Sequence, residues 1–106
     1  MADLREIIQK VREGEYAYSR HALEEMEADG ITHEMLVYAL TEGRPEIVED
    51  YPEDRRGASC LVLAWLPERY PVHIVVGYSR TRARIITVYR PDTVREWQTD
   101  YRTRRP

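Results

Sequence analysis

The sequence predicts an α+β domain in which amino-terminal helices pack on a four-stranded antiparallel sheet and a carboxy-terminal helix follows. Two observations carry this prediction. Up to Gly43, apolar residues recur at helical spacing between capping residues and glycines. Beyond Gly43 the pattern changes to apolar runs separated by short polar turns, and strands joined by short turns are antiparallel neighbours. A length of 106 residues predicts that residues 1–106 form one domain.

Three helices are predicted in the first 43 residues. Each begins after a side chain that can cap free backbone N–H groups and ends at a glycine: 4–13 after Asp3, 20–29 after Ser19, and a helix to about residue 42 after Thr32. The segment Tyr16–Tyr18 is too short for an assignment from its pattern, and we interpret it as an extended link between two helices.

Four strands and a last helix are predicted in the remainder of the chain. The strands cover residues 46–51, 59–66, 72–78 and 84–90. The second of them is apolar almost throughout, which is typical of a central strand buried on both faces. Thr93 and Glu96 have the spacing of a capping box, so a final helix is predicted over residues 94–102.

The composition excludes several classes of protein. No apolar run approaches the ~20 residues that span a bilayer, and the acidic amino terminus does not resemble a signal peptide. Cys60 is the only cysteine, which excludes an internal disulfide and a cysteine-rich zinc site. There is no P-loop, dinucleotide fingerprint or zinc-protease motif. We therefore expect a protein of the reducing cytoplasm without a membrane segment, metal or other cofactor.

The charge is divided unevenly along the chain. The formal net charge is −3 and the isoelectric point is about 5.6. Residues 1–76 carry eight Lys and Arg against sixteen Asp and Glu, whereas residues 77–106 carry eight Arg against three acidic residues. Because arginine suits phosphate recognition, the second part is where RNA would bind. Alternatively, the two parts neutralise each other within the fold or across a homodimer.

His21 is the first candidate for chemistry. It lies in the first turn of the helix predicted after Ser19, where free N–H groups and the helix dipole can hold an anion such as phosphate. The same field favours a neutral imidazole, the form that can act as a base. Arg20 could add a phosphate contact. The alternative is an ordinary surface pair between His21 and Glu25, one turn further along the helix.

A second group of candidates lies on the predicted strands. His73 alternates with Val72 and Ile74, so we expect it to face away from the core onto an open sheet face. Strict alternation places Thr87 and Tyr89 on one face of the last strand and its two arginines on the other, and the register, which decides which faces meet, is left open. Side chains of these types could serve a metal-independent ribonuclease. Alternatively, they form a polar sheet face.

Three segments together resemble the DUF4258 family, a family of domains of unknown function. They are Tyr18–Met26 followed by Gly30 and Ile31, then Pro71–Val76, and then Ile85–Asp92. The likeness extends over nearly the whole chain, to its tryptophan-containing and arginine-rich end.

This resemblance implies the fold of the barnase, EndoU, colicin and RelE-like ribonucleases. It also implies the role of an MqsR-like toxin in a toxin–antitoxin pair, often with a zinc-finger antitoxin of the MqsA/YgiT type. By the same resemblance His21 and His73 are the acid and base, and Thr87 and Tyr89 support them. The phosphate-binding candidates are arginines near these positions: Arg20, Arg82, Arg84 and Arg90.

The sequence thus leads to a metal-independent RNA endonuclease, the toxin of a toxin–antitoxin pair, as the expected function. A non-catalytic module that binds protein or RNA on the same sheet face is the alternative. The acidic amino-terminal part and the scattered histidines favour that alternative.

Overall fold

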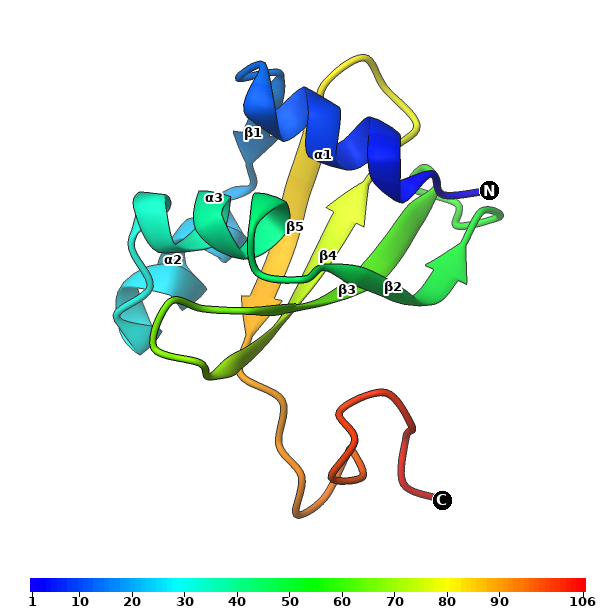
Figure 1. Cartoon of the computed structure of the whole chain (residues 1–106). Helices are drawn as coiled ribbons and strands as arrows, with labels where there is room; N and C mark the ends of the chain where they lie inside the picture. The colour runs from blue at the N-terminus through cyan, green and yellow to red at the C-terminus, as the bar shows by residue number, and fades with distance from the viewer.

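The computed structural model describes residues 1–106 as three helices and one five-stranded sheet (Figure 1). The helices are α1 (Leu4–Arg12), α2 (Arg20–Asp29) and α3 (His33–Thr41). The strands are β1 (Tyr16–Tyr18), β2 (Glu46–Tyr51), β3 (Ser59–Trp65), β4 (Pro71–Gly77) and β5 (Ala83–Tyr89). Their order in the sheet is β1-β5-β4-β3-β2. The predicted α+β class is confirmed.

The helices begin where the sequence predicts, because each capping side chain binds backbone N–H groups only two or three residues further along the chain. The side chain of Asp3 accepts the backbone N–H groups of Arg5 and Glu6 at the start of α1. Ser19 accepts the N–H of Ala22 in α2, and Thr32 caps α3 in the same way. None of the three helices has the length and apolar character needed to cross a membrane.

The sheet is mixed, with a fifth strand at one edge. Tyr16–Tyr18 pairs in parallel with Ala83–Ile85 of β5, so the interpretation of this segment as a link is wrong, as is the prediction of four purely antiparallel strands. Strands β2 to β5 are antiparallel neighbours, as predicted. The partner of β1 lies more than sixty residues away, and a pattern of three residues cannot reveal such a pairing.

The predicted final helix does not form. Residues 91–106, here called the C-terminal segment, consist of turns and one bridge between Trp97 and Arg104. Asp92 accepts the N–H groups of Val94 and Arg95, and Asp100 accepts two further N–H groups. Side-chain bonds of this kind close turns and can also begin a helix, but no helix follows here, because Trp97 is buried against the sheet instead.

The helices cover one face of the sheet and build the core there (Figure 1). Eighteen buried residues form one cluster between them, and Val62, Ile74 and Ile85 are among its members from the three central strands. The opposite face, here called the outer face, carries side chains from the alternate positions of β3 and β4, among them Ser59 and His73. His73 faces away from the core, as predicted.

A β-bulge changes which side chains of β5 reach the outer face. Val76 pairs with Ile85 but Val75 pairs with Thr87, so Ile86 is an extra residue. The prediction that the side chains of β5 alternate strictly between the two faces of the sheet is therefore wrong. The bulge places on one face three candidates that alternation separates: Arg84, Thr87 and Tyr89.

A close backbone approach at Gly43 yields the first testable prediction. A Cβ atom at this position would overlap the carbonyl oxygen of Trp65 and lie 2.8 Å from Cα of Ala39. Gly43→Ala is therefore expected to lower the free energy of unfolding by about 1–3 kcal/mol, as overpacking typically does. Urea denaturation measures this, with the exposed Thr99→Ala as control. Equal unfolding midpoints for the two variants would contradict the close contact.

Candidate nucleic-acid interface on the outer face

A groove of about 580 Å³ crosses the part of the outer face next to the β2–β3 turn. Its floor includes Ser59, Val75 and Thr87, one from each of the three central strands. One wall is the start of α2, with Ser19 and His21. Because β2 lies at the far edge of the sheet, the other wall is formed by the end of β2 and the turn after it: Tyr51, Asp54 and Arg56.

The free edge of β5 holds α2 against the groove. β1 ends at Tyr18, so the backbone of β5 beyond Ile85 has no strand partner on that side. Ser19 Oγ donates to the carbonyl oxygen of Ile86 at 2.7 Å, and Glu25 accepts the N–H of Val88 at 2.8 Å. The first turn of α2 is thereby fixed at the groove wall.

The side chain of Glu25 also fixes His21. One carboxylate oxygen of Glu25 holds the backbone of β5, and the other lies 3.3 Å from Nε2 of His21. The surface pair that the sequence offered as an alternative is therefore present. Because the pair with Glu25 is made through Nε2, Nδ1 is the ring nitrogen left free to accept a proton. A carboxylate that orients an imidazole is also the arrangement of a general base.

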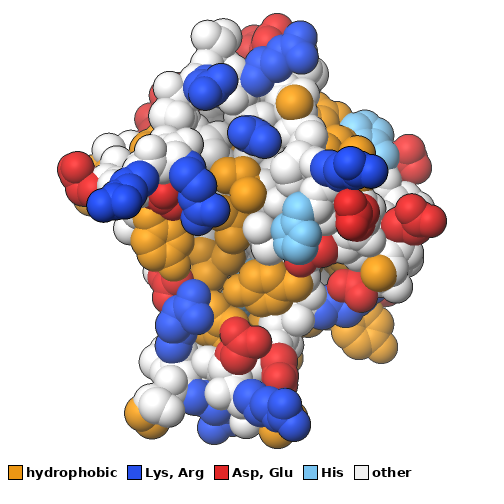
Figure 2. Space-filling view, turned by 180° about the vertical axis from the view of Figure 1, so that it is seen from behind, with side chains coloured by type: hydrophobic (Ala, Val, Ile, Leu, Met, Phe, Trp, Pro, Cys, Tyr) orange, Lys and Arg blue, Asp and Glu red, His pale blue; other side chains and the backbone are white.

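Arginines surround the groove and extend it. Arg56 and Arg84 line it, and an adjoining small cavity shares both of them and adds Arg80 and Arg82. Arg84 forms no ion pair, and the pair between Arg56 and Asp54 is long, at 3.8 Å. Figure 2 shows Lys and Arg side chains distributed around an apolar hollow on this face. The arrangement favours an anionic ligand.

His73 and Tyr89 lie together on the outer face, but the C-terminal segment covers them. Nδ1 of His73 is 3.0 Å from the hydroxyl of Tyr89, and Nε2 is 2.8 Å from the carbonyl oxygen of Tyr101. The ring of Trp97 packs against His73 with a centroid distance of 4.5 Å. His73 is 0% exposed, so the expected open face is wrong at this position. Burial lowers the pKa of His73 below its usual 6.5, although the bond to Tyr101 opposes that shift.

Two double hydrogen bonds anchor the C-terminal segment to β2. Arg102 donates to both carboxylate oxygens of Glu46, at 2.9 and 2.7 Å. Arg104 does the same with Glu49, at 2.8 and 3.0 Å. Part of the basic segment therefore neutralises part of the acidic one within the fold, as one of the two interpretations of the charge predicts.

The remaining predicted phosphate ligands lie apart from the groove lining. Arg20 is 94% exposed in its side chain and faces Glu24 at 3.5 Å. Arg82 lies in the adjoining cavity, 3.8 Å from Glu15. Arg90 donates to the carbonyl oxygen of Asp29 at 3.4 Å, near the end of α2. Of the eight predicted site residues, the groove itself gathers three: His21, Arg84 and Thr87.

Residues 18–90 match the model of a family described as Domain of unknown function (DUF4258). The chain belongs to the DUF4258 family. Searches of curated proteins and of solved structures found no match. The match ends at Arg90, so the predicted likeness at the arginine-rich end lies outside the matched range.

Every candidate residue in the groove of this DUF4258 domain lies within the matched range. His73 and Tyr89 lie within it as well, whereas the C-terminal segment that covers them lies outside. No three His, Cys, Asp or Glu side chains lie together as a metal site would require. The third histidine, His33, is not part of the groove lining and is held between the hydroxyls of Tyr16 and Tyr18 at 3.0 and 2.7 Å.

One wall of the groove in the DUF4258 domain was not predicted from the sequence. Tyr51, Asp54 and Arg56 come from a strand end and a turn that carry no recognisable motif. Arg56 follows Arg55 and precedes Gly57 in a polar turn, and this basic pair is the only local signal. Only the strand order β4-β3-β2 shows that the turn faces α2 across the sheet.

The anchors of the C-terminal segment predict a loss of stability in acid. Hydrogen bonds from Arg102 and Arg104 hold the pKa values of Glu46 and Glu49 below the usual 4.5. Each of these carboxyl groups has a lower pKa in the folded state than in the unfolded state. Its contribution to the free energy of unfolding is therefore complete above the unfolded pKa and is lost as pH falls through the folded pKa. The urea concentration at the unfolding midpoint is therefore expected to decrease as the pH falls below about 4.5, the usual pKa of these glutamates.

The double variant Glu46→Gln/Glu49→Gln tests this origin. It should be less stable than the wild type at pH 7 and should lose less stability between pH 5 and pH 3, because the two carboxyl groups no longer titrate. Glu27→Gln/Glu34→Gln removes two exposed carboxylates that form no ion pair and serves as control. An identical acid profile for the wild type and the Glu46/Glu49 variant would contradict the assignment.

Proposed function

We propose that this DUF4258 domain is a metal-independent RNA endonuclease whose substrate lies in the groove of the outer face. The observation that carries the proposal is the juxtaposition of an oriented His21–Glu25 pair with the unpaired Arg84 in one groove. An RNA phosphate placed between them would meet a proton acceptor and a cation. These are two of the groups that cleavage by the 2′-hydroxyl requires.

In the proposed reaction, Nδ1 of His21 takes the proton of the 2′-hydroxyl, and the resulting oxyanion attacks the adjacent phosphorus. The bond from phosphorus to the 5′-oxygen breaks, and that oxygen takes a proton from water. Arg84 stabilises the negative charge that develops on the phosphoryl oxygens. Thr87 on the floor of the groove can donate a hydrogen bond to the same phosphate.

A role for His73 and Tyr89 in this reaction requires movement of the C-terminal segment. They occupy the same face as Val75 and Thr87 and form the next pair on that face: His73 lies two residues before Val75, and Tyr89 lies two residues after Thr87. Displacement of Trp97 and Tyr101 would therefore extend the groove to them. In that state His73 could supply the proton for the leaving oxygen, with Tyr89 positioning its ring.

The resemblance of Tyr18–Met26, Pro71–Val76 and Ile85–Asp92 to the DUF4258 family supports a narrower proposal, that the chain acts in the cytoplasm as an MqsR-like toxin. A zinc-finger antitoxin of the MqsA/YgiT type would then be its partner. The arginines around the groove offer such a partner a surface complementary to an acidic element. Occupation of that surface would block access of RNA to His21.

A non-catalytic RNA- or protein-binding module is the second candidate. The burial of His73 favours it, because the groove then holds a single histidine and no second acid or base of that type. Such a module would use the same arginines and floor, without proton transfer.

Controlled expression in bacteria separates the two candidates. The enzyme is expected to arrest growth, and the double variant His21→Ala/His73→Ala is expected to relieve the arrest at equal protein level. Expression of the variant is checked by immunoblot, so that loss of folding is not mistaken for loss of activity. Unaffected growth with the wild type, or equal arrest by both proteins, would favour the binding module.

A further inference from the structure

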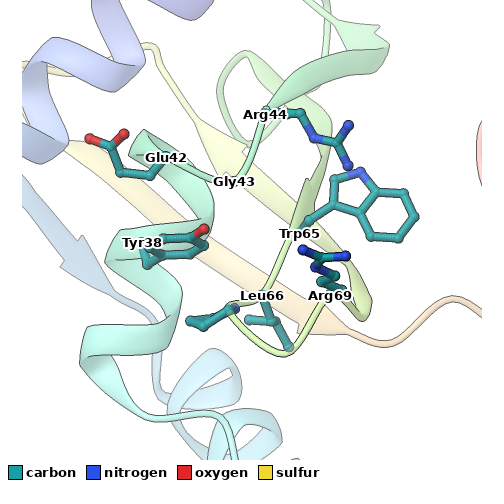
Figure 3. Close-up of a pocket in the computed structure, with 8 residues that line it drawn as sticks. Tyr38, Glu42, Gly43, Arg44, Trp65, Leu66 and Arg69 are labelled. Carbon is teal, nitrogen blue, oxygen red and sulfur yellow. The ribbon is translucent and has the colours of Figure 1, made fainter.

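The largest cavity of the molecule lies away from the groove, between the end of α3 and the β3–β4 turn (Figure 3). Its volume is about 730 Å³, within the range of about 300–1,000 Å³ typical of ligand pockets. The side chains that matter for its chemistry are two aromatic rings, Tyr38 and Trp65, and two arginines, Arg44 and Arg69. Neither the proposed mechanism nor the core uses them.

Three residues that lie around Trp65 have an unusual backbone conformation. Three residues other than glycine have positive φ: Arg44 at 51°, Arg69 at 68° and Tyr101 at 62°. Arg44 and Arg69 line the cavity with Trp65, and the ring of Tyr101 meets Trp65 edge-on at 5.8 Å. Residues other than glycine that have positive φ are concentrated at functional sites. Here all three are grouped around one indole.

The two guanidinium groups in the cavity are not neutralised. Arg44 lies over the ring of Trp65 at 5.6 Å, and neither Arg44 nor Arg69 forms an ion pair with a carboxylate. Glu42 is the acidic residue of the lining, but its carboxylate points away from both arginines (Figure 3) and lies 3.8 Å from Arg12. The cavity therefore presents two free positive charges beside aromatic surface.

We propose that this cavity binds a nucleoside phosphate unit, either as a free nucleotide or within single-stranded RNA. Arg44 and Arg69 would bind the phosphate, because guanidinium groups suit its geometry. The base would stack on the ring of Tyr38, which is 39% exposed, or on the Arg44–Trp65 stack. This site is separate from the groove, and it does not depend on RNA cleavage there.

Calorimetric titration of the full chain tests the proposal with four probes. They are adenosine monophosphate, inorganic phosphate, an acidic peptide such as hexaglutamate, and 2′-O-methyl hexauridylate, which has no 2′-hydroxyl to attack the phosphate and is not cut. The test variant is Arg44→Gly/Arg69→Gly, because glycine adopts positive φ without strain and removes both charges. Tyr38→Ala tests stacking. Arg5→Gln/Arg95→Gln removes two exposed arginines outside both sites.

We expect binding of the mononucleotide or the oligonucleotide to weaken about tenfold or more in the Arg44→Gly/Arg69→Gly variant. Binding should also weaken in Tyr38→Ala and stay unchanged in the control. Whether the mononucleotide binds by itself distinguishes a free nucleotide from RNA. Equal affinity for inorganic phosphate, tighter binding of the peptide, or no binding of any probe would overturn the proposal. Because Arg84→Ala impairs only the groove, its unchanged mononucleotide affinity separates this site from the proposed function.

Discussion

Replacing His21 by alanine is expected to lower the rate of RNA cleavage in EDTA by about 10²- to 10⁴-fold, the usual contribution of a general base. The reason is geometric: Glu25 orients the imidazole from 3.3 Å, and no other histidine lines the groove. Stability should change little, because the side chain of His21 is exposed. The measurement is the initial rate on a labelled RNA, with protein purified free of other nucleases.

His33→Ala is the matched control, since it removes an exposed histidine outside the groove. It should cleave RNA at the wild-type rate. The double variant His21→Ala/His73→Ala should be no slower than His21→Ala alone if the C-terminal segment remains in place during the reaction. A further loss in the double variant would show that His73 takes part. Wild-type rates with His21→Ala would remove His21 from the mechanism.

The second large effect concerns Trp97, the residue that closes the outer face. Trp97 is fully buried against His73, and the guanidinium of Arg104 lies over its ring at 4.5 Å. Trp97→Ala is expected to cost about 3–5 kcal/mol of unfolding free energy, from a total that is typically about 5–15 kcal/mol. The value should lie near the lower end, because the indole N–H is buried without a hydrogen-bond partner.

Two measurements check this prediction. Urea denaturation should show the loss for Trp97→Ala and almost none for Val94→Ala, because Val94 is 79% exposed. NMR titration should show the pKa of His73 below 6.5 in the wild type and closer to 6.5 in the variant, because solvent reaches the ring. An unchanged midpoint together with an unchanged pKa would mean that Trp97 does not cover His73.

The buried His73 also links stability to pH. Since its folded pKa is lowered, the unfolded chain takes up the proton first as pH falls. The contribution of the neutral ring is therefore complete above about pH 6.5, the usual pKa of histidine, and decreases as pH falls towards the folded value. The Glu46 and Glu49 anchors act at lower pH, so the two effects can be separated.

Local chemistry explains which parts of the fold could be predicted. Asp3, Ser19 and Thr32 cap helices through atoms within a few residues, and the sequence shows them directly. β1 and the bulge at Ile86 depend on partners elsewhere in the chain, and periodicity carries no information about those. The absence of the last helix also depends on distant contacts, because burial of Trp97 on the sheet outweighs the local capping signal.

The same distinction applies to the site. His21 could be predicted because its place follows from a capped helix start. Thr87 and Arg84 were candidates on opposite faces, and the bulge brings them together. His73 was expected to be accessible, because the sequence of β4 does not show that Trp97 and Tyr101 return to cover it.

The division of charge has a more specific meaning in the folded molecule. Arg102 and Arg104, part of the basic excess, neutralise β2 and hold the C-terminal segment in place. Arg84 at the groove and Arg80 in the adjoining cavity remain free of ion pairs, and Arg56 from the acidic part lines both. The proposed RNA site therefore draws its charge from both parts of the chain.

The chemical ends of RNA cut in EDTA test the central proposal most directly. Attack by the 2′-hydroxyl leaves a 2′,3′-cyclic phosphate on one fragment and a 5′-hydroxyl on the other. We expect these ends from the wild type, and from His21→Ala a rate of formation lower by about 10²- to 10⁴-fold. Products with a 3′-hydroxyl and a 5′-phosphate, or an intact RNA after incubation with folded wild-type protein, would contradict a metal-independent ribonuclease in this groove.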